Sequence, residues 1–263
     1  DEAHNIESPD RGLNIEMLIS IVKSDCKYAN LLLLTPFIPN SNEVSKWINE
    51  DNPKSIEIQL HWWKPNDQVI GIYYAEGKMR NWITYFEPLI TTHHTIFFPK
   101  KIQVGGYNDA IFNIPYLKLN SKSLLTSIVA KQLEDVGPLL IVARTINDTW
   151  KIADNLCKYF EPIEDEDISL IKRFVTAELS ENFPLVRYLS KGIGIHHAGL
   201  PDEVRYLMEW LMEENKLRVL VATTTIAQGI NFPVSEILMA SYSYPFEEMP
   251  VRDFWNIVGR AGR

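Results

Sequence analysis

The sequence predicts an α/β fold in which a parallel sheet is flanked by helices. Short runs that are almost entirely apolar recur along the chain, and helical patterns lie between them. Strands without a polar face are typical of parallel sheets buried on both sides, and alternating strands and helices are typical of βαβ units. The chain has 263 residues, enough for one large domain or two smaller ones with a real core.

Strands are expected at four apolar runs of strand length, at residues 31–34, 139–143, 219–222 and 237–240, and such fully apolar strands suit parallel sheets. A helix is expected at 147–160, where Trp150 and Ala153 recur at helical spacing. A second helix is expected at 201–215, because Pro201 is favoured in a first helical turn and apolar residues follow on one face.

Residues 53–115 break this rhythm, because aromatic and β-branched residues dominate in stretches such as "SIEIQLHWW" and "QVIGIYYAEGK". This composition predicts several strands or hairpins, with turns at Gly77 and at Gly105-Gly106. A domain junction is expected just before this segment. Residues 1–52 would be the C-terminal part of one α/β domain, and residues 53–263 would be a second domain with a β-rich opening segment.

Composition indicates the class of protein, its cellular compartment and the binding surfaces to expect. Apolar residues make up 46% and charged residues 23%, as in ordinary soluble domains, and no apolar run approaches the roughly 18 residues of a membrane span. Two cysteines are too few for a disulfide framework or a zinc site, so a cytoplasmic location is expected. A net charge of −8 argues against a basic face over the whole surface, but it permits a local groove for phosphates.

Charged residues near both ends of the chain suggest phosphoryl chemistry. The opening "DEAH" places two acids side by side, which could hold hydrated magnesium and orient a water for attack on a γ-phosphate. The alternative is a solvated acidic turn. The closing "WNIVGRAGR" places Arg260 and Arg263 three residues apart in a glycine-broken turn, which suits charge on a transferring phosphoryl group. The alternative is an ordinary basic helix end.

Two internal stretches add possible binding groups. In "VLVATTTIAQGINFP" a buried strand runs into a loop rich in threonine, whose hydroxyl and N–H groups could bind phosphates of a nucleotide or a nucleic acid. The alternative is a satisfied strand-to-helix turn. In "GIGIHHAGLP" the adjacent His196 and His197 should point to opposite faces. We therefore expect core or supporting residues there, and not joint metal ligands.

In this order the motifs resemble those of superfamily 2 helicases, and "HHAGLP" with "GRAGR" points to the Ski-like subgroup of DExH-box helicases. "DEAH" is similar to motif II, "LLLLTPFIPNSNEVSKWI" to motif III and its following helix, "LLIVARTINDTWKIADNL" to motif IV, "ATTTIAQGINFP" to motif V and "NIVGRAGR" to motif VI. The resemblance implies the end of a first RecA-like domain followed by a second one. It also implies a parent protein with a phosphate-binding loop upstream and further domains downstream.

The resemblance implies a role for each matching position, with ATP and Mg²⁺ as cofactors. Glu2 would orient the attacking water, and Arg260 and Arg263 would act as arginine fingers across the domain cleft. Asp1 would hold Mg²⁺ through water, and Thr35 would couple hydrolysis to strand separation. The positions expected at the nucleotide are His4, Gly229, Asn231 and Asn256. The positions expected to contact the backbone of RNA or DNA, taken to be single-stranded, are Arg144, Thr145, Thr223 and Thr224.

The expected function is therefore that of an ATP-dependent helicase or translocase of which this chain is a fragment. The sequence contains no G-x-x-x-x-G-K-[ST] loop, so the fragment alone is predicted not to hydrolyse ATP. The alternative is a nucleic-acid-binding or scaffold protein that kept the fold and lost turnover. Phe37, at the third position of motif III, and Asn256, where the family has glutamine, are departures that leave this alternative open.

Overall fold

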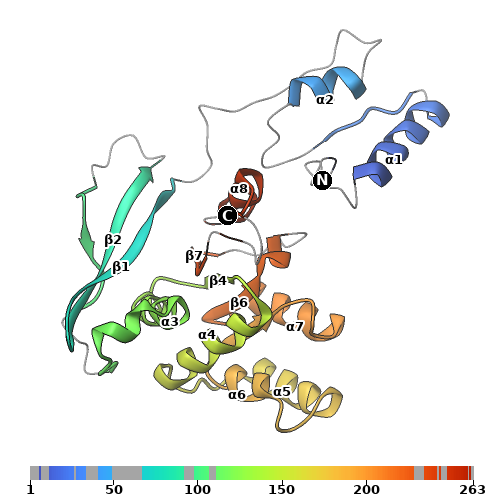
Figure 1. Cartoon of the computed structure of the whole chain (residues 1–263). Coiled ribbons are helices and arrows are strands. Elements are labelled where there is room, and N and C mark those ends of the chain that lie inside the picture. Colours follow the sequence, from blue (N-terminus) through green and yellow to red (C-terminus); the bar gives the residue numbers. More distant parts are fainter. Residues whose placement is uncertain are drawn as a thin grey trace. The chain divides into compact units, whose positions relative to one another are not determined.

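The computed structural model describes residues 12–26, 28–33, 41–48, 67–91, 98–106, 111–227, 234–241 and 248–259, with the single residues 6, 243 and 261. By its internal contacts the chain divides into two units, residues 1–64 with 250–259 and residues 65–249 with 260–263. Each unit is described by itself, with the element labels of Figure 1. The junction expected before residue 53, and the assignment of both parts to successive RecA-like domains, stay predictions.

The second unit contains a four-stranded parallel sheet with the strand order β5-β6-β4-β7. Its strands are β4 (Leu139–Ala143), β5 (Ile193–His196), β6 (Val219–Thr223) and β7 (Glu236–Met239). Every residue of β4, β5 and β6 is buried, as expected for strands covered on both faces. The predicted α/β fold with a parallel sheet is confirmed, and so are the strands predicted at 139–143, 219–222 and 237–240.

Helices flank this sheet: α3 (Lys122–Gln132), α4 (Ile146–Tyr159), α5 (Glu166–Glu178), α6 (Pro184–Leu189) and α7 (Asp202–Glu213). Among them, α4, α6 and α7 contact the strands directly. Helix α4 buries Ile152, Ala153 and Leu156, whose spacing puts them on one face. The helices predicted at 147–160 and 201–215 are confirmed, with ends shifted by one or two residues; Pro201 lies just before the first turn of α7.

The preceding segment forms a separate antiparallel sheet with the order β1-β2-β3. Its strands are β1 (Val69–Lys78), β2 (Asn81–Thr91) and β3 (Ile102–Gln103), and β1 and β2 are the long paired arrows in Figure 1. Met79 has a φ of 52° in the two-residue turn of this hairpin. Gly77 has a φ of 154° two residues before it, where a Cβ would collide with the backbone of Asn81. A hairpin is therefore observed within the stretch expected to be β-rich, but its turn lies at residues 79–80 and the turn expected at Gly77 is wrong, because Gly77 is still paired within β1. The stretch "SIEIQLHWW" lies outside the described residues.

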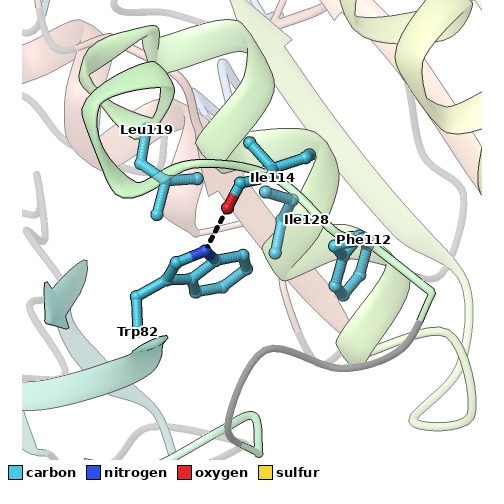
Figure 2. Close-up of a cluster of buried hydrophobic side chains, with 5 residues drawn as sticks. All are labelled: Trp82, Phe112, Ile114, Leu119 and Ile128. Atoms are coloured by element: carbon cyan, nitrogen blue, oxygen red, sulfur yellow. Dashed lines mark hydrogen bonds between the residues drawn. The ribbon is translucent and has the colours of Figure 1, made fainter. Parts of the chain in front are cut away.

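One buried cluster anchors the antiparallel sheet to the rest of the unit (Figure 2). Trp82 of β2 is fully buried, and its indole Nε1 donates a hydrogen bond of 2.7 Å to the carbonyl oxygen of Ile114. The side chains around it are Phe112, Ile114, Leu119 of the short 3₁₀ helix η2 (Tyr116–Asn120), and Ile128 of α3. Phe112 in turn packs edge-on against Tyr159 at the end of α4, so the cluster joins the hairpin to a helix of the parallel layer.

The described helices of the first unit are α1 (Gly12–Asp25), α2 (Ser41–Ile48) and α8 (Val251–Val258). Lys23 Nζ of α1 donates a hydrogen bond of 3.1 Å to the carbonyl oxygen of Trp47, and α2 is the helix expected after motif III. The strand predicted at 31–34 is wrong over residues 31–33, which form no strand. A strand is stabilised by pairing, and the described residues of this unit offer no strand as a partner.

Across both units, the helices that the structure describes are all too short or too polar to cross a bilayer.

Candidate functional site

The carboxyl ends of the parallel strands gather motif residues at one edge of the sheet. Ala143 of β4 lies opposite Thr223 of β6, so the residues that follow them, Arg144 and Thr224, lie on neighbouring strands at the same level. In open α/β sheets ligands bind outside the carboxyl ends of the strands. The structure therefore brings together Arg144, Thr145, Thr223 and Thr224, the residues expected to contact nucleic acid.

Thr145 forms the N-terminal cap of α4. Its hydroxyl oxygen accepts a hydrogen bond of 3.1 Å from the backbone N–H of Asp148, and it lies 2.8 Å from Asp148 Oδ2. Since an ionised carboxylate only accepts, the single hydroxyl proton of Thr145 is donated to Asp148. Thr145 can therefore accept a further hydrogen bond but has no proton left for a phosphate oxygen. The exposed side chain of Arg144 is the stronger donor at this corner.

The two threonines after β6 differ in access. Thr223 is the last residue of the strand and is only 8% exposed. Thr224 opens the 3₁₀ helix η3 (Thr224–Ala227) and is half-buried. The strand-to-loop turn expected in this motif is thus a strand followed by a short helix, and Thr224 is the residue better placed to meet a ligand from solvent.

His196 ends β5 and points towards α7. Its Nε2 lies 2.7 Å from Oε1 of Glu209, and because the carboxylate accepts, Nε2 donates. Burial lowers the pKa of His196, while the charge and hydrogen bond of Glu209 partly offset that effect. The partner Glu209 was missed from the sequence, because it lies 13 residues further along, on a helix. No group of three metal-binding side chains is found among the residues that the structure describes.

His197, the next residue, contacts a different element. Its Nδ1 accepts a hydrogen bond of 3.0 Å from the N–H of Gly199, and its ring packs edge-on against Trp150 of α4 at 5.3 Å between centroids. The neutral ring therefore carries its proton on Nε2. Burial lowers the pKa of His197, with His196 and Arg205 adding to the effect. Both histidines are buried supporting residues that fix the corner after β5, as their alternation along a strand predicted.

The remaining expected residues are mostly outside the described part of the chain. Those positions are Asp1, Glu2, His4, Thr35, Gly229, Asn231, Arg260 and Arg263. Asn256 is described: it lies on α8 of the first unit, is 3% exposed, and its Oδ1 has no hydrogen-bond partner among the described residues. A buried carbonyl oxygen without a donor is costly, so a ligand that supplies one would be favoured at Asn256.

Comparisons with known proteins add an independent observation. No family model matches the chain. It is 30% identical over 279 residues to "Hachiman protein HamB" of Bacillus cereus, with all of the chain and 24% of that protein covered. It is 26% identical over 274 residues to "ATP-dependent DNA helicase Hel308" of Methanocella arvoryzae, of which 32% is covered. It is 25% identical over 283 residues to "RQC trigger complex helicase SLH1" of Saccharomyces cerevisiae, of which 12% is covered.

The chain is homologous over its full length to ATP-dependent helicases. The resemblance to DExH-type helicases of superfamily 2 that its motifs indicate is therefore confirmed, and the parallel sheet with flanking helices agrees with a RecA-like domain. The chain spans between about a quarter and a third of the length of the first curated relatives it matches.

Proposed function

We propose that the chain is part of an ATP-dependent helicase or translocase that couples ATP hydrolysis to movement along RNA or DNA, or to its unwinding. The observation that carries the proposal is the edge where Arg144 and Thr145 follow β4 and Thr223 and Thr224 follow β6, on strands paired in register. Homology to ATP-dependent helicases supports it. Because the chain spans only part of those relatives, the activity is proposed for the full-length protein, with the cytoplasm as its location.

On the nucleic-acid side, the strand would bind through its phosphates. The Arg144 guanidinium would supply charge, the Thr224 hydroxyl would donate a hydrogen bond, and the cap at Thr145 would fix the start of α4 beneath them. Contacts to phosphates carry no sequence information. We therefore expect a single strand, of RNA or DNA, to bind at this edge without sequence preference.

On the nucleotide side, the proposed roles come from the resemblance, and ATP and Mg²⁺ are the proposed ligands. Asp1 would hold the metal through water, Glu2 would orient the attacking water, and Arg260 and Arg263 would stabilise charge on the phosphoryl group. The supporting positions would be His4, Gly229, Asn231 and Asn256, with Thr35 as the coupling residue. Of all these, the structure describes Asn256 alone.

The first test is ATP hydrolysis by the full-length protein with single-stranded RNA, single-stranded DNA or no nucleic acid. We expect stimulation by at least one nucleic acid. Binding of nucleic acid without any hydrolysis would favour the alternative, a binding or scaffold module that has lost turnover. The 263-residue chain alone should not hydrolyse ATP. ATP hydrolysis by this chain that Glu2→Gln abolishes would contradict the proposal that hydrolysis requires a phosphate-binding loop from elsewhere in the full-length protein.

The second test addresses the edge itself with two charge-matched variants on the two ends of α4. Arg144 lies at its start, and Lys158 is an exposed residue near its end. In the full-length protein, Arg144→Gln should weaken single-strand binding and reduce the slope of log K against log salt by about 0.7, the value for one phosphate contact. Lys158→Gln should leave the slope unchanged. Equal slopes for wild type and Arg144→Gln would remove this edge from the binding surface.

A further inference from the structure

The described residue between the two arginines of "GRAGR", Ala261, is held from two sides. Its backbone forms a parallel bridge with Val234, just before β7. Its carbonyl oxygen accepts a hydrogen bond of 3.1 Å from Nε2 of Gln68, which lies just before β1 and 193 residues away in sequence. All three residues belong to the second unit. Two distant segments therefore hold the backbone of Ala261 within "GRAGR", the stretch expected to form the arginine turn.

The fixed peptide matters because of what surrounds it in the sequence. Arg260 is bonded directly to Ala261, and Gly262 and Arg263 follow. Glycine has a wide choice of backbone conformations, so a turn of this composition does not hold two long side chains in one direction by itself. The carbonyl of Ala261 lies in the plane of the peptide that leads to Gly262. A donor on that oxygen therefore restricts the orientation of the peptide group of Ala261, the residue between the two arginines in sequence.

We propose that Gln68 is a positioning residue for the arginine turn: its side-chain amide holds the Ala261 carbonyl so that Arg260 and Arg263 reach the transferring phosphoryl group together. This inference rests on the proposed ATP hydrolysis by the full-length protein. Gln68 acts through Ala261 and does not itself contact the nucleotide. Its effect should fall on the transition state, where the charge that the arginines stabilise is largest.

The chain contains a matched control for this bond. Gln103 of β3 is also partly buried, and its Nε2 also donates to a backbone carbonyl, that of Gly105, at 2.9 Å. That bond closes a local loop and involves no residue of the arginine turn. Gln68→Met and Gln103→Met therefore remove the same donor with nearly the same change of shape, one just before β1 and one in β3 of the same unit.

The experiment measures nucleic-acid-stimulated ATP hydrolysis and melting temperature for full-length wild type and both variants. Gln68→Met should lower kcat about tenfold, the scale expected for a small misplacement of catalytic groups, and should leave KM for ATP within about twofold. Gln103→Met should leave kcat unchanged. If Gln68→Met does not fold, Gln68→Glu replaces it, because a carboxylate keeps the shape of the amide and cannot donate to the carbonyl when ionised.

Tryptic cleavage gives a readout that does not depend on activity. Trypsin cuts after Arg260, and release of the Ala261 carbonyl should make cleavage at this bond faster in Gln68→Met than in wild type or Gln103→Met, as followed by mass spectrometry. A wild-type protein without stimulated hydrolysis would overturn the proposed function. An active wild type with normal kcat and normal cleavage in Gln68→Met would overturn only the role of Gln68. Equal losses of kcat in both variants, with equal falls in melting temperature, would reduce that role to general stability.

Discussion

The parallel and the antiparallel sheet of the second unit are stabilised in different ways. In the parallel sheet, every residue of β4, β5 and β6 is buried. In the antiparallel sheet, β1 has no buried residue and β2 has three consecutive ones that begin at Trp82. The parallel sheet is thus stabilised by many buried side chains, each with a small contribution. The antiparallel sheet is stabilised mainly by the few residues packed around the indole of Trp82. The proposed nucleic-acid-binding edge belongs to the parallel sheet, where the strands are held by many buried contacts.

Removal of the Trp82 indole, which anchors the antiparallel sheet, should lower the free energy of unfolding more than any other change considered. Trp82→Ala should lower the free energy of unfolding by about 4 kcal/mol, since it leaves a cavity and an unpaired carbonyl at Ile114. Hydrogen exchange should show loss of protection in β1 and β2 with protection kept in β4 and β6. Ile72→Ala, at a residue 54% exposed on β1, should change stability by less than about 0.5 kcal/mol. Equal loss of protection in both sheets would show that Trp82 stabilises the whole unit and not the antiparallel sheet in particular.

A middle-sized effect is expected at a helix cap of the parallel layer. Asp165 Oδ1 accepts from the backbone N–H groups of Asp167 and Ile168 at the start of α5, and Oδ2 lies 2.9 Å from Lys216 Nζ. Asp165→Ala should reduce the free energy of unfolding by about 1 kcal/mol. Asp167→Ala, which loses a longer contact of 3.3 Å to Lys216, should cost less. Chemical denaturation measures both, and a larger loss for Asp167→Ala would show that the ion pair outweighs the cap.

The pH dependence of this cap has a defined sign. The hydrogen bond from Lys216, followed by that from Ile168, lowers the pKa of Asp165 below its usual value. A group whose pKa is lowered in the folded state contributes stability above its unfolded pKa of about 3.9 and loses it as pH falls further. The difference between wild type and Asp165→Ala should therefore be constant near neutral pH and shrink below about pH 4.

The smallest effect is expected where the two sheets approach each other. Glu236 of β7 has a buried Oε2 that finds no hydrogen-bond partner within the described part of the chain, and burial raises the pKa of this carboxyl group. Its charge also acts on Tyr73 of β1, whose pKa is raised first by burial and then by Glu236. A raised carboxyl pKa costs stability as pH rises from about 4.5. At pH 7, Glu236→Gln should stabilise the protein, by less than about 1 kcal/mol because Glu236 is only partly buried.

A pH series in thermal unfolding checks this prediction. The advantage of Glu236→Gln over wild type should appear above about pH 4.5 and vanish below it. Glu248→Gln is a control for the loss of one carboxylate, since Glu248 is an exposed residue of the same unit, and it should change stability by less than about 0.5 kcal/mol. An advantage that grows as the pH falls would contradict the sign derived from burial.

The fold was predictable where a continuous run of apolar residues indicates a buried strand. Residues 139–143 and 219–222 are continuous apolar runs because their strands are covered on both faces. The run at residues 31–33 has the same composition but lacks a paired neighbour among the described residues, and composition cannot reveal that. Helix α5 was overlooked although Asp165 and the spacing of Ile168, Ile171 and Val175 signal it.

The candidate site was predictable to the extent that its residues follow strands. Arg144 and Thr223 come directly after apolar runs, so a parallel sheet places them and Thr224 at one edge. The T-x-x-D pattern of Thr145 and Asp148 would have indicated a cap. In contrast, the contact of Gln68 with Ala261 joins residues 193 positions apart, and nothing in the local pattern of either residue indicates the other.

The separation of Gln68 and Ala261 also fixes when their contact forms during synthesis. At about 5–20 residues per second, the 193 residues between them take roughly 10–40 s to be made. The hairpin and the strands β4 to β7 are all translated before Ala261, so they can pair while the arginine turn is still in the ribosome. Ala261 would then dock onto a surface that has already folded. The arginines expected to act in ATP hydrolysis, Arg260 and Arg263, are thus synthesised after the strands of both sheets.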